Sequence, residues 1–78
     1  MDITQKTIEF FFNQYGVVDP DQKAKILPEI TDTIYEYNMH VVKYEKETDE
    51  YKKKQILTGL QELEKKIEEV FGEITGKK

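Results

Sequence analysis

The 78-residue chain contains no cysteine, no serine, no arginine and no tryptophan. Without cysteine it can form neither a disulfide nor a thiolate nucleophile nor a zinc-ribbon site. Without serine it lacks a common hydroxyl nucleophile, and without arginine it lacks the forked donor that recognises phosphate and guanine. These absences exclude the serine and cysteine nucleophile classes of enzyme and argue against binding to nucleic acid.

A long apolar run and a basic surplus are also missing. No segment approaches the roughly 20 apolar residues that a membrane-spanning helix needs. The chain begins Met-Asp rather than with a basic stretch followed by an apolar one. Its 12 basic residues, all lysines, are outnumbered by 16 acidic residues, which gives a formal net charge of −4. We therefore expect a cytoplasmic protein that binds neither membranes nor nucleic acid.

What is present is a helical pattern. Period-two alternation and Asn-Gly or Asp-Gly hairpin dipeptides are absent, whereas apolar residues recur at three- and four-residue steps. A chain of this size holds only one small core, since it buries about 60% of the surface that its unfolded state exposes. The sequence thus predicts a single all-α domain over residues 1–78.

A short first helix is predicted over residues 3–15. Asp2 and Gln5 have the spacing of a capping box. Four apolar or aromatic residues then recur at helical spacing: Ile8, Phe11, Phe12 and Tyr15. Gly16 suits the left-handed position that follows a helix, and either Val17 or Val18 is expected to fold back onto the last turn.

A second helix is predicted over residues 20–46. Asp19 is a good N-cap and Pro20 suits the first helical position. Pro28 has no N–H for the carbonyl of Ala24, so we expect a kink or a brief break there. Six residues step along one side of this helix by three and four: Leu27, Ile30, Ile34, Tyr37, Val41 and Tyr44.

A third helix is predicted over residues 50–75. Its apolar side is formed by six residues at the same steps: Ile56, Leu60, Leu63, Ile67, Val70 and Ile74. The two patterns are out of phase, so a turn in the polar window 45–50 is favoured over one long bent helix from residue 29 to 75. Gly59 lies within the pattern, where it indicates either a close helix crossing or an exposed position that tolerates glycine.

The predicted fold is therefore a small three-helix bundle, in which a short N-terminal helix packs on a long helical hairpin. The stepping by three and four gives the hairpin coiled-coil-like faces, which favour oligomers. Thr31 and Asn38 fall inside the apolar arc of the second helix. Such polar residues either set the register between chains or satisfy a backbone carbonyl near Pro28.

The aromatic content exceeds what the predicted helices can bury. Phe10 lies outside the apolar stripe of the first helix, and Tyr35, Met39 and Val42 lie on a second arc of the second helix. Exposed aromatic surface of this kind marks an interface. We predict an interface with another protein or with a second copy that includes six residues: Phe10, Phe12, Tyr15, Tyr35, Asn38 and Met39.

The sequence contains no recognisable catalytic or metal-binding motif. His40 is the only histidine, and Glu36 one turn before it does not complete the Glu-x-x-His step of a di-iron bundle. The expected function is non-enzymatic, without cofactor or metal. The chain is predicted to be a small regulator, inhibitor or immunity-type protein that occludes its partner.

Two alternatives remain open from the sequence. In the first, an oligomer holds an anionic small molecule such as a nucleotide between its chains, because aromatic rings and ammonium groups suit such a ligand. Six residues would line that pocket: Tyr15, Lys23, Tyr37, His40, Lys43 and Tyr44. In the second, the chain is a structural coiled-coil part of a larger assembly.

Overall fold

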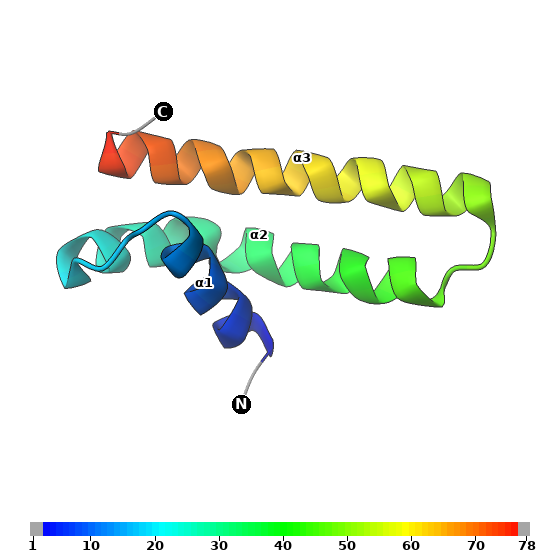
Figure 1. Ribbon diagram of the computed structural model, residues 1–78, viewed down its shortest axis with the longest axis horizontal. Coiled ribbons are helices and arrows are strands. Elements are labelled where there is room, and N and C mark those ends of the chain that lie inside the picture. The colour runs from blue at the N-terminus through cyan, green and yellow to red at the C-terminus, as the bar shows by residue number, and fades with distance from the viewer. Residues whose placement is uncertain (1–2, 77–78) are drawn as a thin grey trace.

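The computed structural model describes residues 3–76, which form three helices: α1 (Ile3–Gln14), α2 (Pro20–Lys46) and α3 (Glu50–Thr75). The helices α2 and α3 run antiparallel, and α1 lies across α2 (Figure 1). Residues 47–49 form the connection between α2 and α3. The predicted all-α three-helix fold with a helical hairpin is confirmed, and the alternative of one helix from residue 29 to 75 is wrong.

The end of α1 follows the predicted glycine motif. Gly16 has a φ of 68°, and the N–H of Val17 donates to the carbonyl of Phe12 at 2.9 Å. Val17 is thereby folded back and buried, whereas Val18 is exposed. The pair closes the last turn and directs the chain towards α2. The proposed cap at the start of α1 involves Asp2, which lies outside the described residues.

The second helix begins as predicted but does not break at its internal proline. Asp19 is the N-cap, and its side chain accepts from the N–H of Asp21. α2 then runs continuously through Pro28, so of the predicted kink or brief break, the break is wrong. Ile26 and Ile30, on either side of the proline, are fully buried. Their packing offsets the one backbone hydrogen bond that Pro28 cannot make.

Thr31 satisfies a backbone carbonyl near Pro28, which is one of the roles predicted for it. Its hydroxyl donates to the carbonyl of Leu27 at 2.6 Å, one turn earlier and next to Pro28. Leu27 itself is 40% exposed, whereas Ile26 is fully buried, so the core side of α2 begins one residue earlier than predicted. Leu27 lies about 100° further round the helix than Ile26, on a side that is left to solvent.

The core is concentrated at one end of the molecule, which we call the three-helix end. Among the described residues, the most deeply buried large side chains lie in α2 up to residue 34 and in the second half of α3: Ile26, Ile30, Ile34, Ile67 and Phe71. The ring of Phe71 meets the ring of Phe12 edge-on at 5.9 Å and stacks on Tyr15 at 4.5 Å. The rings of Phe12 in α1 and of Tyr15, just after α1, therefore cover Phe71 and complete the core at this end.

The rest of the hairpin, residues 42–60, forms an arm that extends beyond α1 (Figure 1). Leu60 is its only buried residue. Just before the arm, His40 packs against Gly59: a Cβ atom on this glycine would lie 3.1 Å from Cδ2 of the ring. Gly59 thus permits a close contact between α2 and α3, which supports the close-crossing interpretation.

Candidate functional site

Three of the six predicted interface residues are exposed in the structure. Phe10 is 59% exposed, Tyr35 58% and Met39 43%. Phe12 is buried in the core at 4%, so its place in the predicted surface is wrong, because its ring is used to cover Phe71. Tyr15 and Asn38 are half-buried.

The exposed apolar residues of α2 form one line, which we call the outer stripe: Tyr35, Met39 and Val42. Their spacing of four and three residues places them within about 60° of one another around the helix. Val42 is 38% exposed and belongs to this line, although the predicted interface omits it. The sequence signal for Val42 was its position seven residues after Tyr35.

The outer stripe faces away from α3. On the opposite side of α2, Tyr37 donates from its hydroxyl to Oε1 of Glu64 at 3.1 Å, and His40 packs on Gly59. At about 100° per residue, these two contacts lie on nearly the opposite side of the helix from the stripe. The core formed with α3 therefore leaves the stripe uncovered.

Beside the outer stripe, α1 and α2 enclose a shallow groove of about 340 Å³. Phe10 and Thr7 line it from α1, and Asn38 and Val41 line it from α2. Asn38 and Val41 lie about 100° round α2 from the stripe residues that follow them, between the outer stripe and the side that faces α3. The exposed ring of Phe10 therefore lies on α1 next to this groove and is separate from the line of the outer stripe.

Asn38 joins α1 to α2 rather than pointing to an open surface. Its Oδ1 lies 3.0 Å from Oγ1 of Thr7, which is also 3.0 Å from the carbonyl of Ile3. The hydroxyl has one proton and cannot donate to both. Nδ2 of Asn38 is buried without a partner. Turning the amide over lets Nδ2 donate to Thr7 and Thr7 donate to Ile3, so both bonds then have a proton.

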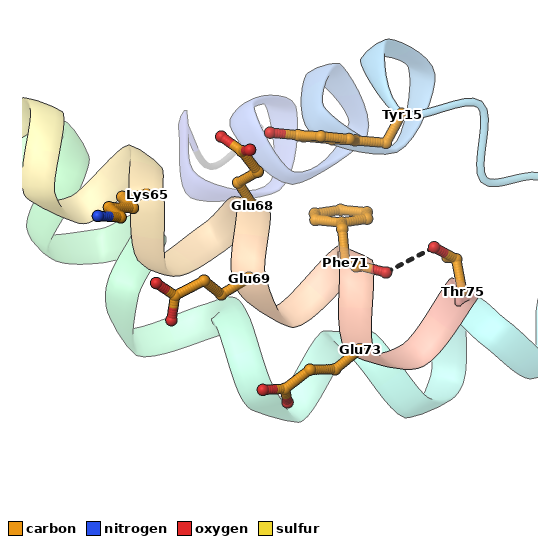
Figure 2. A pocket seen from close by; sticks show the side chains of 8 residues that line it. Tyr15, Lys65, Glu68, Glu69, Phe71, Glu73 and Thr75 are labelled. Atoms are coloured by element: carbon orange, nitrogen blue, oxygen red, sulfur yellow. Dashed lines mark hydrogen bonds between the residues drawn. The ribbon is translucent and has the colours of Figure 1, made fainter. Parts of the chain in front are cut away.

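A larger hollow of about 610 Å³ lies beside the second half of α3. Figure 2 shows the ring of Tyr15 lying over that of Phe71, with carboxylates spread along the helix below. Glu68, Glu69 and Glu73 line this hollow, and among the described residues Lys65 is the only basic one there. Burial, and then the negative charges of Glu68 and Glu64, raise the pKa of Tyr15 above its ordinary value. This field would repel an anion.

The six residues predicted to line an anion pocket do not gather in one place within the chain. Tyr15 borders the acidic hollow, and Tyr37 borders the groove beside Phe10. Tyr44 lies in the arm, with Nζ of Lys53 5.3 Å from its ring centroid. The remaining three are also dispersed: Lys23 over the ring of Phe12, His40 against Gly59, and Lys43 exposed on α2.

His40 makes contacts that account for it without a ligand. Its Nδ1 lies 2.8 Å from the carbonyl of Glu36, and its ring rests on Gly59. Among residues 3–76 no group of histidine and acidic side chains is arranged to hold a metal ion. None of the helices in that range is both long enough and apolar enough to cross a bilayer.

Comparison with known proteins gives no relative from which a function could be transferred. No family model, no curated protein and no solved structure matches this chain. The structural feature that best indicates a function is therefore the exposed apolar surface of the outer stripe and Phe10.

Proposed function

We propose that the chain is a non-enzymatic protein-binding module that acts by covering a surface of its partner. The binding surface is the outer stripe of α2 together with Phe10 of α1. One observation carries the proposal: three apolar side chains in line on α2, and Phe10 on α1, are 38–59% exposed on a chain whose core is already closed. Tyrosine, phenylalanine and methionine are enriched at protein interfaces.

The shape of the surface supports a protein rather than a small molecule as the partner. The stripe lies along an open helix side, and the adjoining groove of about 340 Å³ is shallow. Small-molecule sites instead enclose most of their ligand in a concave pocket. An exposed helix with apolar residues at steps of four and three is suited to packing against another helix.

The experiment places a photoreactive benzophenone amino acid at Tyr35 on the outer stripe. The matched control places it at Tyr51 on α3, which is also an exposed tyrosine, at 69%. After irradiation in cells that encode the chain, we expect protein adducts from position 35 and few from position 51. Equal adducts at both positions, or none at position 35, would contradict the proposed surface.

A further inference from the structure

We infer that the outer stripe binds a second copy of this chain, with the two α2 helices packed antiparallel across a two-fold axis near Met39. This inference rests on the proposed function, because it assigns a partner to the same surface. Symmetric pairing requires that the surface complement itself. Both the apolar residues and the charges of α2 meet that requirement in the antiparallel arrangement.

The apolar residues are arranged symmetrically about Met39. Tyr35 lies four residues before it and Val42 three residues after it. In an antiparallel pair centred there, Tyr35 of each copy packs beside Val42 of the other, and the two Met39 side chains meet at the axis. A large ring opposite a small branched side chain fills the space between two helices without a gap.

Charged residues within the stripe and along one side of it complement each other in the same arrangement. Asp32 and Glu36 are exposed on the N-terminal side of Met39, and Lys43 and Lys46 are exposed on its C-terminal side. In an antiparallel pair each flank faces the same flank of the other copy. Asp32 then lies next to Lys46 of the second copy, and Glu36 next to Lys43.

A parallel pair would bring like charges together, because each residue would then lie near its own counterpart. The antiparallel pair also places the positive end of one helix dipole beside the negative end of the other. Charge complementarity of this kind selects orientation and partner more than it adds affinity. It therefore determines how the two copies dock, while the apolar stripe supplies the contact.

The first helix is placed to enlarge this contact. Figure 1 shows the N-terminal half of α1 projecting past α2 on the side away from α3. The helical spacing places the outer stripe on the side of α2 that faces away from α3 as well. Phe10 is 59% exposed and lines the groove with Asn38, which lies about 100° round α2 from Met39. In the paired form, the ring of Phe10 from each copy would therefore lie at the edge of the apolar interface.

Self-association would regulate the proposed binding surface. A second copy and a different protein partner would compete for the outer stripe. The dimer is therefore an inactive form, because its outer stripe is already buried. Dilution or a tighter partner releases it by mass action. The concentration at which the chain pairs would then set the amount of free binding surface.

The test uses the purified chain and two charge-reversed variants, with solution mass measured by light scattering during size exclusion. One variant carries Asp32→Lys and Glu36→Lys, and the other carries Lys43→Glu and Lys46→Glu. We expect the unmodified chain to have twice its mass of 9.3 kDa. Each variant alone should pair at least about tenfold more weakly, because four attractive contacts per dimer become repulsive. Mixing the two variants should restore pairing.

A control variant reverses two exposed charges on α3, with Glu62→Lys and Lys66→Glu, and should pair like the unmodified chain. A monomeric unmodified chain would overturn the inference, and so would pairing that both charge-reversed variants retain. Neither outcome bears on the proposed function, which the adducts from position 35 test. Adducts at the mass of a different protein, with a monomeric purified chain, would support the proposed function and reject the second copy.

Discussion

The two ends of the hairpin contain similar helices but differ in how well they are covered. At the three-helix end, α1 adds Ile8, Phe11 and Phe12 to the α2–α3 contact, and all three are buried there. In the arm of residues 42–60, two helices pack alone and only Leu60 is buried. Each helix of a packed pair buries only one narrow apolar stripe. A third helix is therefore needed to enclose side chains on all sides and form a hydrophobic core.

This difference explains only some of the exposed apolar residues. Val42 and Leu57 belong to the arm and are 38% and 42% exposed. At the three-helix end, Leu27 and Tyr35 are 40% and 58% exposed, because they lie on sides of α2 away from the buried core. No helix among residues 3–76 covers the apolar side chains of the outer stripe or most of those in the arm. We propose that a binding partner covers those of the outer stripe.

The largest difference between the two ends should appear on truncation of a buried side chain. Phe71→Ala removes a ring that is 1% exposed and contacts both Phe12 and Tyr15. We expect a loss of about 3–5 kcal/mol in the free energy of unfolding, which is comparable to the whole stability of a chain this small. Leu60→Ala, in the arm, should cost only about 2 kcal/mol. Urea unfolding followed by circular dichroism measures both, and equal losses would refute the comparison.

Amide hydrogen exchange should show the same contrast without any substitution. The side chains of Ile30 in α2 and Ile67 in α3 are fully buried, so we expect their amides to exchange only through global unfolding. Amides of the arm, such as those of Lys43 and Leu57, should exchange at least about tenfold faster through local opening. Uniform protection along both helices would mean that the arm unfolds only together with the core.

A smaller effect is expected at the contact between His40 and Gly59. Alanine stabilises a helix interior by about 1 kcal/mol relative to glycine, but here its Cβ would lie 3.1–3.2 Å from the His40 ring. We expect Gly59→Ala to leave the stability nearly unchanged. In a His40→Ala background, the same substitution should stabilise by about 1 kcal/mol. If Gly59→Ala stabilises equally in both backgrounds, the ring contact does not constrain this position.

The smallest effect concerns Tyr37, which lies between the two ends. Burial, then the charge of Glu64 and the hydrogen bond to it, raise the pKa of Tyr37 above 10.0. The folded state therefore holds this proton more tightly than the unfolded chain does. The resulting stabilisation is complete below pH 10 and is lost as the pH rises through the folded pKa.

Substitution of Tyr37 by phenylalanine isolates this contribution. Tyr37→Phe should lower the free energy of unfolding by about 0.5 kcal/mol at neutral pH, because it removes the hydrogen bond to Glu64. The difference from the unmodified chain should shrink above pH 10. Unfolding curves at pH 7 and at alkaline pH measure both values, and a difference that does not change with pH would contradict the assignment.

The parts of the fold predicted correctly are those that depend on local chemistry. Gly16 and Asp19 mark helix ends because they satisfy the backbone within a few residues of themselves. The two out-of-phase apolar patterns placed a turn near residues 47–49, even without glycine or proline there. The prediction of a break at Pro28 failed because buried neighbours, and not the proline alone, decide whether the helix continues.

The candidate site was only partly predictable. Phe10, Tyr35 and Met39 were identified because they lie outside the apolar stripes of their own helices. Phe12 was assigned to the surface incorrectly, since its pattern does not reveal that its ring would cover Phe71. Asn38 was predicted to set the register between chains or to satisfy a backbone carbonyl, whereas its side chain contacts Thr7 of α1, 31 residues away along the chain.

The sequence by itself determined the number of helices, their ends and the excess of apolar side chains, since these depend on composition and on spacing along the chain. The tertiary structure alone decided which side of each helix is covered. Whether a ring is buried depends on where a neighbouring helix lies, and α1 reaches only one end of the hairpin. That placement turned Phe12 and Phe71 into core and left Tyr35, Met39 and Val42 as exposed surface.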